Sequence, residues 1–499
     1  MVGTERGRRW LSQVWHGLYR DTQGLLATCM PLAAPRPGMY TYRLNSDHGQ
    51  RRLHLRVEQD GSGVLFVDVT DVIHLNPTAT QMTRLALDGV DRDQARTMLL
   101  RGIQANDRAR CSADLTQIYT MVERLREPGH GCATCAIAPL QHTPLFSTPV
   151  HAPYKADLAL TYGCNNACAH CYNEADRIAM PSLELHEWYR VVDTLATVGV
   201  PHLILTGGEA TLYPHLLDLI HYADQHGMIV GLNTNGRRLA HPGYAQALVS
   251  AGLNHVQITL GSCQAEVHNA MMGANSFQQT VRGIEQALAS GLHTITNTTL
   301  MQRNRDHVAE IITFLHTLGI RTFAMNSMIA AGGGCNSPDA LAVEELAPLL
   351  VSIRDQAADL GMRFLWYTPT EYCRLSPVEL EIGARRCNAG EYTLCVEPDG
   401  SVLPCQSYYV SAGNILHDPW EQIWNSALFR SFRERIDDPQ QFGLPPECWQ
   451  CPDLLLCGGG CRLEREARST TTTTTMIKLM LPDARRKRAA SATRREERG

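Results

Sequence analysis

The stretch that says most about this protein is Thr161-Tyr-Gly-Cys-Asn-Asn-Ala-Cys-Ala-His-Cys-Tyr172. It places three thiols, Cys164, Cys168 and Cys171, at the spacing C-x3-C-x2-C, directly after an apolar run over 156–160. A [4Fe–4S] cluster has four irons and normally takes four cysteines. Three closely spaced thiolates would leave one iron open to an exogenous molecule. A structural zinc loop built from the same cysteines and His170 is the alternative.

Strand-like and helix-like patterns alternate on both sides of this loop. The expected strands cover 156–161, 202–206, 228–233, 255–260, 293–300 and 321–327, with amphipathic helices such as Leu183–Val198 and Phe277–Ala289 between them. Six β/α units in succession predict an α/β fold with a parallel sheet, closed or partly closed into a (β/α)6 TIM-like barrel. In such barrels the chemistry lies at the carboxyl ends of the strands, where the cysteine loop falls.

The next strands also end in residues suited to a ligand. The second ends in Gly207-Gly208-Glu209, where the glycines let the backbone approach a ligand, leaving carbonyls and a carboxylate to meet an ammonium group. Asn233 and Asn235 end the third strand, Thr259 ends the fourth, and Asn297 on the fifth is expected to point into the barrel. For these single residues, turn capping or satisfaction of the barrel core is an equal alternative.

Together, the cysteine loop followed by an aromatic residue and the Gly-Gly-Glu turn resemble the signature of radical S-adenosylmethionine (SAM) enzymes. The resemblance implies that a [4Fe–4S] cluster on Cys164, Cys168 and Cys171 binds SAM through its open iron and cleaves it to a 5′-deoxyadenosyl radical. It also implies that Gly207, Gly208 and Glu209 contact the amino group of SAM. The implied contacts to the rest of SAM come from Asn233, Asn235 and Thr259. An external electron donor, flavodoxin or ferredoxin-like, would supply the electron.

A second group of cysteines lies near the C-terminus. Cys387, Cys395 and Cys405 come first, and Cys448, Cys451, Cys457 and Cys461 follow as C-x2-C-x5-C-x3-C. A zinc ribbon fits seven cysteines poorly. The spacings resemble the SPASM extension of peptide-modifying radical SAM enzymes, which carries auxiliary iron–sulfur clusters. Gln406 stands where sulfatase-maturing relatives carry an aspartate, which disfavours that role.

The resemblance implies one or two auxiliary clusters. The first would use Cys387, Cys395, Cys405 and Cys461, and the second Cys448, Cys451 and Cys457. The family usually supplies one more cysteine downstream, but no cysteine follows Cys461 here. Cys373 or Asp483 is conceivable as the missing ligand, although no spacing supports either. With three ligands, the second cluster is expected to be the more labile.

Residues 36–127 predict a small winged-helix-like β3α3 domain. Strands are expected at Met39–Leu44, Arg52–Val57 and Val64–Val69, and helices near 79–87, 92–102 and 113–125. The junction His74–Ala79 resembles the Leu-Asn-x-Thr-Ala turn of the peptide-chaperone domain of pyrroloquinoline quinone biosynthesis. Such modules bind a precursor peptide as an added strand, here expected among residues 52–69. A structural or DNA-binding role is the alternative, and the few charges on the third helix disfavour DNA.

Length and composition set the outer limits. The chain has 499 residues, a net charge of −5, 44% hydrophobic residues and 17 cysteines. These values favour about three domains, disfavour nucleic acid and membrane partners, and favour the reducing cytoplasm. Cys132 and Cys135 are unremarkable linker thiols or lend a ligand to a cluster elsewhere. The expected segments are a helical segment (1–35), a peptide-recognition domain (36–127), a linker (128–150), a radical SAM core (151–335), a bridging region (336–386), a SPASM domain (387–468) and a disordered basic tail (469–499).

The expected function is reductive cleavage of SAM followed by oxidative modification of a ribosomally made precursor peptide. The product would be a thioether, a carbon–carbon crosslink or another oxidised residue, with an auxiliary cluster accepting the substrate electron. One alternative keeps the chemistry but acts on a small molecule or cofactor precursor. Another is a non-catalytic iron–sulfur redox regulator that binds DNA. No side chain stands out in the sequence as a catalytic residue beyond these cofactor ligands.

Overall fold

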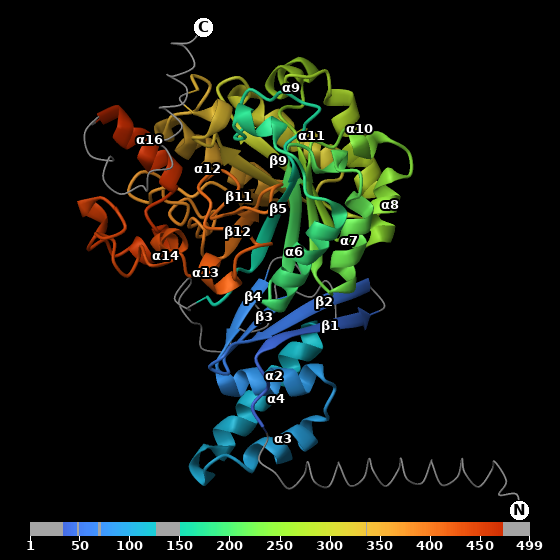
Figure 1. The fold of residues 1–499 in the computed structure, drawn as a ribbon, viewed down its shortest axis with the longest axis vertical. Coiled ribbons are helices and arrows are strands. Elements are labelled where there is room, and N and C mark those ends of the chain that lie inside the picture. The colour runs from blue at the N-terminus through green and yellow to red at the C-terminus, as the bar shows by residue number, and fades with distance from the viewer. Residues whose placement is uncertain (1–32, 47–48, 68–70, 126–149, 336, 473–499) are drawn as a thin grey trace, which may run out of the picture.

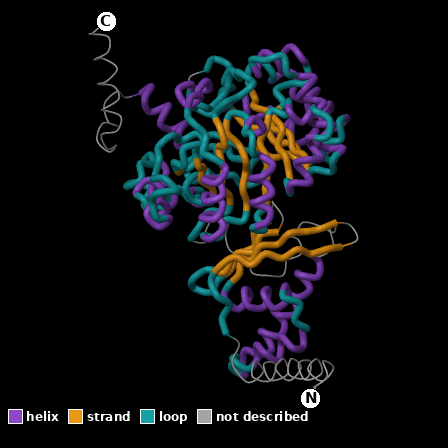
Figure 2. The backbone as a smooth tube through the Cα atoms, turned by 45° about the vertical axis from the view of Figure 1, so that its right-hand side comes forward, coloured by secondary structure: helices purple, strands orange, loops and turns teal. Residues whose placement is uncertain are grey.

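A computed structural model of the chain describes residues 33–46, 49–67, 71–125, 150–335 and 337–472. A small sheet with three helices lies below a large sheet wrapped by helices, and the C-terminal extension lies against one side of the large sheet (Figure 1). The tube view shows the strands of the two sheets as separate groups (Figure 2). The described residues do not include 1–32, 473–499 or most of the predicted linker, which contains Cys132 and Cys135.

The N-terminal module is a four-stranded antiparallel sheet followed by three helices. Its strands, in the order β1-β2-β3-β4, are β1 (Gly38–Ser46), β2 (Gly49–Val57), β3 (Gly63–Val67) and β4 (Asp71–Leu75). The helices are α2 (Pro77–Leu87), α3 (Arg92–Leu100) and α4 (Arg108–Leu125). The predicted β3α3 order was therefore wrong by one strand, because the apolar run after residue 64 contributes two strands, β3 and β4, instead of one.

The sheet order also corrects the predicted docking edge. Residues 52–69 belong mainly to β2 and β3, and each of these strands already pairs with a neighbour on both sides. A strand whose two edges are both paired has no backbone groups left for an added peptide. Among the described residues, the outer strands of this sheet, each paired on one side, are β1 and β4.

The junction between β4 and α2 is a helix start. Asn76 caps α2, since its side-chain Oδ1 accepts a hydrogen bond of 2.9 Å from the backbone N–H of Ala79. Pro77 occupies the first turn, where its missing N–H costs nothing. One face of the sheet then packs on the three helices around Leu55, Leu65 and other buried apolar residues. The Leu-Asn-Pro-Thr-Ala motif is therefore explained by its role in starting α2.

The large sheet begins with six parallel strands, as predicted. They are β5 (Lys155–Thr161), β6 (His202–Gly207), β7 (Ile229–Thr234), β8 (His255–Thr259), β9 (His293–Leu300) and β10 (Thr322–Ser327). The covering helices are α6 (Leu185–Thr197), α7 (Leu216–Gln225), α8 (Tyr244–Ala251), α9 (Ala265–Met272), α10 (Phe277–Ala289), α11 (Val308–Thr317) and α12 (Val343–Asp359). Alternate strand residues, such as Leu158 and Val230, pack under these helices in the main core. The intervening residues therefore face the barrel interior.

Three further strands extend this sheet at both ends. β11 (Arg363–Trp366) pairs with β10, while β12 (Thr393–Val396) pairs in parallel with β5 and antiparallel with β13 (Val402–Leu403). The order β11-β10-β9-β8-β7-β6-β5-β12-β13 is open, which confirms a partial barrel. The C-terminal extension is completed by α13 (Trp420–Trp424), α14 (Ala427–Arg433), α15 (Leu454–Cys457) and α16 (Arg462–Thr472). α16 runs four residues into the predicted tail.

The N-terminal module docks against the amino ends of the barrel strands. Arg56 is buried and donates hydrogen bonds to the carbonyls of Ala152 (3.1 Å) and Gly199 (3.2 Å), which precede β5 and β6. His54 Nε2 lies 2.6 Å from the carbonyl oxygen of Gly227, before β7. The module is therefore at the opposite end of the barrel from the cysteine loop, which follows β5. No helix in the described part of the chain is both long and apolar enough to cross a membrane.

Candidate functional site

The loop with Cys164, Cys168 and Cys171 is held by segments distant in the sequence. The N–H groups of Ala167 and Ala169 each donate a hydrogen bond of 3.0 Å, to the carbonyls of Met272 and Met271. The N–H of Gly333 donates one of 2.7 Å to the carbonyl of Cys171. The loop therefore has a defined path at the carboxyl end of β5.

Glycine is required where one of these segments meets the loop. A Cβ added at Gly273 would lie 2.1 Å from the carbonyl oxygen of Ala167, and this residue has φ +59°. The Gly332–Gly334 run after β10 was not singled out in the sequence, although three adjacent glycines signal a close backbone approach.

Burial affects the protonation of the three thiols. Desolvation raises the pKa of the Cys168 thiol to about 12, and it also raises the pKa of Cys164 and Cys171. A bound cation would stabilise the thiolates that burial otherwise disfavours. Nearby, His170 Nδ1 and Asn166 Nδ2 are buried polar atoms with no hydrogen-bond partner.

The geometry also bears on the zinc alternative. Within the described ranges, no three His, Cys, Asp or Glu side chains converge closely enough to hold one metal ion. Tetrahedral zinc at about 2.3 Å from each sulfur would draw the sulfurs to about 3.8 Å from one another. A cubic cluster binds each thiolate at a different iron, so its ligands need not converge on one point. The donor set therefore fits a cubic cluster better than zinc.

The Gly207-Gly208-Glu209 turn packs directly on the start of the cysteine loop. The N–H of Gly208 donates to the carbonyl of Thr161 (2.7 Å), and the N–H of Glu209 donates to the carbonyl of Gly163 (3.0 Å). A Cβ added at Gly208 would lie 2.4 Å from the carbonyl oxygen of Tyr162. The glycines here serve the contact between two strand ends.

The carboxylate of Glu209 joins β6 to β7. Its Oε1 accepts hydrogen bonds from Thr211 N–H (3.1 Å), Thr211 Oγ1 (2.6 Å) and Thr234 Oγ1 (2.7 Å), and its Oε2 accepts one from the N–H of Asn235 (2.7 Å). The side chain is 1% exposed. In this arrangement Glu209 positions the turn around the site, and Oε2, which accepts one bond, can accept a further donor.

The other predicted SAM contacts surround the same mouth. Asn235 Nδ2 donates a hydrogen bond of 2.6 Å to Asn165 Oδ1 in the cysteine loop. Asn233 and Thr259 lie partly buried on β7 and β8. Asn297 faces the barrel interior, and its Oδ1 is buried without a partner. An unpaired buried acceptor there suits a polar ligand inside the barrel.

The cysteines of the proposed first auxiliary cluster gather beside β12. The pKa of Cys405 is raised by burial and then by the nearby Cys387, and the pKa of Cys461 is raised to about 12 by the same two causes. Cys395 is fully buried on β12, where Cys405 and Asp157 add to the rise in its pKa caused by burial. The structure therefore brings all four predicted ligands of this set into one region.

The remaining three cysteines lie in a separate turn. Cys448 and Cys451 are linked by a backbone hydrogen bond of 3.2 Å from the Cys451 N–H to the Cys448 carbonyl, and Cys457 ends α15. Burial and then the thiol of Cys457 raise the pKa of Cys448 to about 11. This set also lies close together.

A group of tyrosines connects the cysteine loop to the C-terminal extension, and the sequence patterns did not indicate it. Tyr409 Oη donates to the carbonyl of Tyr172 (3.2 Å), and Tyr162 Oη donates to Glu397 Oε1 (2.9 Å). The Arg177 guanidinium lies 3.9 Å from the ring centroid of Tyr409 and forms an ion pair with Glu397. This packing fixes the extension against the barrel mouth.

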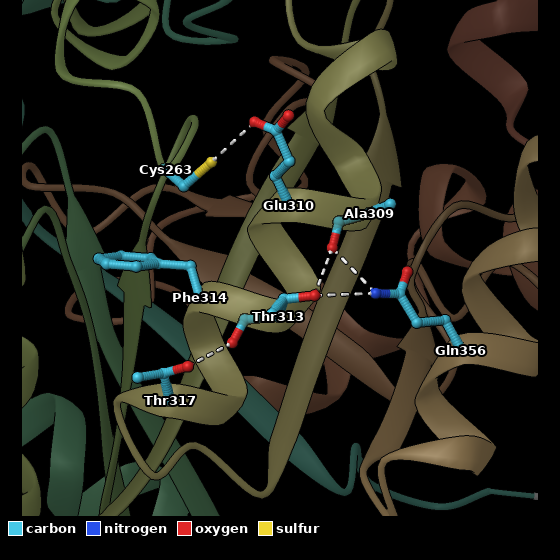
Figure 3. Close-up of a pocket in the computed structure, with 7 residues that line it drawn as sticks. All are labelled: Cys263, Ala309, Glu310, Thr313, Phe314, Thr317 and Gln356. Carbon is cyan, nitrogen blue, oxygen red and sulfur yellow. Dashed lines mark hydrogen bonds between the residues drawn. The ribbon is translucent and has the colours of Figure 1, made fainter.

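A hollow of about 470 Å³ lies elsewhere, on the helical outside of the barrel (Figure 3). It is lined by α11, by Gln356 of α12 and by Cys263, whose Sγ lies 3.9 Å from Glu310 Oε2. Its lining contains no residue predicted to bind SAM or iron. The hollow is therefore separate from the candidate site.

Comparison with known proteins fits this geometry. The model of the radical SAM superfamily matches residues 158–315, and that of an iron–sulfur cluster-binding domain, SPASM, matches residues 387–452. The chain is similar to the mycofactocin maturase MftC of Mycobacterium tuberculosis, with 30% identity over 63% of this chain and 80% of the relative.

The chain belongs to the radical SAM superfamily. This membership confirms an enzyme that uses a [4Fe–4S] cluster and SAM, with a SPASM domain for auxiliary iron–sulfur clusters. Another radical SAM relative is the AdoMet-dependent heme synthase of Methanosarcina barkeri, with 28% identity over 62% of this chain and 92% of the relative. The fold resembles that of Streptococcus suis SuiB bound to its precursor peptide SuiA, with TM-score 0.60 and 15% identity over 85% of this chain and 96% of SuiB.

Proposed function

We propose that this radical SAM enzyme oxidatively modifies a ribosomally made precursor peptide. The observation that carries the proposal is the free edge of β4 in a module docked on the barrel. MftC is by name a maturase, and SuiB has been crystallised with a precursor peptide. These likenesses support a peptide substrate over a role in DNA binding.

The docking edge for the peptide leader is proposed to be β4 instead of β2 or β3. In the part of the chain that the structure describes, β4 pairs with β3 alone, so its other edge can accept an added strand. Val72 on this strand is 42% exposed, an apolar side chain that a bound strand would cover. The edge also lies close to the barrel, since His74 Nε2 is 3.4 Å from Tyr154 Oη, directly before β5.

The position of β4 sets a length requirement on the peptide. The leader edge adjoins the start of β5, and the cysteine loop follows its end, seven residues later. At about 3.3 Å per residue the two places are roughly 23 Å apart. A precursor that reaches both therefore needs at least about seven extended residues between its docked segment and the modified residue.

The chain's own residues hold, orient and enclose the reactants. When bound, the clusters and SAM supply the one-electron chemistry. We propose that Cys164, Cys168 and Cys171 hold the SAM-binding cluster, while Glu209 fixes the turn that borders SAM. Asn233, Asn235 and Thr259 are proposed to line the rest of the SAM site. The buried tyrosines at the mouth would exclude water from the radical.

The proposed auxiliary ligands are Cys387, Cys395, Cys405 and Cys461 for the first cluster, and Cys448, Cys451 and Cys457 for the second. An external flavodoxin or ferredoxin-like donor is proposed as the source of the electron. We also propose a cytoplasmic location, because thiols used for iron–sulfur clusters need a reducing compartment.

The test is anaerobic reconstitution followed by an assay for 5′-deoxyadenosine and for peptide mass changes. Replacement of Cys164, Cys168 and Cys171 by alanine should abolish 5′-deoxyadenosine formation. The candidate substrates are synthetic peptides covering each short reading frame beside the gene. Persistence of SAM cleavage in the triple variant would refute the assigned site.

The peptide edge is tested by Val72→Asp. A charge on the docking edge should weaken binding of the substrate peptide, identified by its mass change, by about tenfold, equal to about 1.4 kcal/mol. Val378→Asp is the matched control, because Val378 is a similarly exposed valine (45%) outside the module. Equal affinities for the two variants would reject β4 as the docking edge.

A small-molecule substrate is the second candidate, and the heme synthase relative favours it. That enzyme class needs no leader-binding edge. Turnover of a porphyrin precursor of heme, with no modification of any neighbouring peptide, would favour this alternative.

A further inference from the structure

The cysteine set Cys448, Cys451 and Cys457 lacks one ligand for a fully coordinated cubic cluster. The chain has no cysteine after Cys461, so a fourth thiol must come from upstream if it comes from this chain. The segment Thr370–Cys373, between β11 and β12, lies against this turn.

Two contacts join that segment to Cys457. The N–H of Tyr372 donates a hydrogen bond of 3.3 Å to Cys457 Sγ, and Cys457 Sγ lies 3.8 Å from the carbonyl oxygen of Thr370. Cys373 is the next residue after Tyr372. A backbone N–H that points at a thiolate is typical of the surroundings of an iron–sulfur cluster, where such bonds tune the sulfur.

The glycine run after Cys457 allows this close approach. Gly458, Gly459 and Gly460 all have positive φ, at +61°, +72° and +66°. A Cβ added at Gly460 would lie 2.9 Å from the backbone nitrogen of Glu371. Any other residue at Gly460 would push the 370–373 segment away from the cysteine turn.

The segment is also fixed from its other side. Glu371 Oε2 forms an ion pair of 2.6 Å with Arg468 of α16. Tyr372 Oη accepts a hydrogen bond of 3.0 Å from the N–H of Arg385. Because Glu371 is engaged in this way, its carboxylate is not the free ligand of the set.

We propose that Cys373 is the fourth protein ligand of the second auxiliary cluster, together with Cys448, Cys451 and Cys457. The inference rests on the proposed assignment of those three cysteines to a cluster. The geometry that carries the proposal is the hydrogen bond to Cys457 Sγ from the N–H of Tyr372, the residue directly before Cys373.

Cys373 is exposed, as expected for a thiol at the rim of a ligand set. A cluster with four thiolates has no iron open to substrate, so its role is electron transfer. It also has no reason to be the more labile of the two auxiliary clusters, contrary to the expectation from three ligands.

The experiment uses the variant in which Cys164, Cys168 and Cys171 are alanine, so that only auxiliary clusters remain. In anaerobically reconstituted protein, iodoacetamide labelling is read by mass spectrometry before and after iron loading. Cys373 should be labelled in the iron-free form and protected in the loaded form. Cys263, in the outer hollow, is the control thiol and should be labelled equally in both.

A second readout uses Cys373→Ala in the same background, with Cys263→Ala as the matched variant. Reduced protein is examined by electron paramagnetic resonance with and without cyanide, a probe for an iron that lacks a protein ligand. Cyanide should change the spectrum of Cys373→Ala alone, and this variant should lose iron to a chelator roughly tenfold faster.

The outcomes separate this inference from the proposed function. Equal labelling of Cys373 in both forms, or a Cys373→Ala spectrum unaffected by cyanide, would overturn the ligand assignment while leaving the first auxiliary cluster intact. Uptake of only about four irons per chain, instead of about eight, would remove the second cluster itself. If Cys373→Ala does not fold, the labelling experiment on the unmodified position still decides.

Discussion

Tyr172 Oη donates a hydrogen bond of 3.1 Å to Gln406 Oε1. Tyr172 directly follows Cys171, and Gln406 directly follows Cys405. The bond therefore joins the residue after the last thiol of the barrel loop to the residue after a proposed ligand of the first auxiliary cluster. Gln406, the residue that disfavours a sulfatase-maturing role, thus connects two loops that are proposed to hold clusters.

Tyr172→Phe should uncouple SAM cleavage from product formation. The change removes one hydrogen bond, worth about 1 kcal/mol, and loosens the contact between the two loops without touching a thiol. We expect several-fold less modified peptide per 5′-deoxyadenosine, measured by mass spectrometry in one reaction. Tyr222→Phe is the control, because it loses a bond of 2.8 Å to Asp193 on the helical surface. An unchanged ratio in Tyr172→Phe would contradict this role.

Glu209→Gln should weaken SAM binding. The new amide would turn an N–H toward one of the donors that the carboxylate now accepts, which leaves buried groups unpaired at a cost of about 1–3 kcal/mol. That cost corresponds to a roughly 5- to 150-fold rise in the dissociation constant for SAM, measurable by equilibrium dialysis. Glu285→Gln, at an exposed position on α10, should bind SAM normally. Equal affinities would show that the four bonds to Glu209 do not shape the site.

Gly208→Ala should reduce the iron held by the barrel loop. Its Cβ would meet the carbonyl oxygens of Tyr162 and Gly163 at 2.4 Å and 2.5 Å, so β6 and the loop must separate. Iron content and 5′-deoxyadenosine formation should fall together. Gly102→Ala is the control, since the nearest atom to its Cβ is 4.0 Å away. Full iron loading in Gly208→Ala would show that the loop tolerates displacement.

Acid should destabilise the base of the barrel. Burial lowers the pKa of His255 to about 3 and that of His54 to about 4. The unfolded chain, with histidine pKa near 6.5, then binds more protons than the folded chain below that pH. Stability is therefore present above about pH 6.5 and is lost as the pH falls toward 4. At pH 5.5 the loss is about 1.4 kcal/mol for each histidine.

Urea unfolding of the triple-alanine variant without iron, at pH 7.5 and 5.5, measures this effect. The charged and titratable groups around these rings are Arg52, Lys155, His202 and His293. They are basic, so they oppose a further proton. His255→Gln should lower the dependence on pH. A urea midpoint that is the same at both pH values would contradict the prediction.

The sequence predicted the local elements of the barrel well. The period of the apolar residues placed β9 and α10 at their observed bounds, because both are long and amphipathic. The motifs placed the cysteine loop and the Gly-Gly-Glu turn at neighbouring strand ends. Features that depend on one continuous segment, such as a helix, a strand or a motif at a strand end, could therefore be predicted.

The errors concern relationships between distant segments. β4 was missed because its pattern continues that of β3, and the docking edge was misplaced because strand order does not follow from strand positions. β12 consists of four residues whose pairing with β5 depends on tertiary structure. Cys373 could be named from the sequence as a conceivable ligand, but no spacing supported it, because its segment meets Cys457 only in the folded chain.

The pairing of β12 with β5 limits how the C-terminal extension can move relative to the barrel. Cys395 lies on one of these strands, and the cysteine loop continues from the other, so the backbone hydrogen bonds of a single sheet separate them. A hinge motion between these two groups of cysteines would have to break the backbone hydrogen bonds between β12 and β5. The spacing between the two groups of cysteines is consequently set when the chain folds.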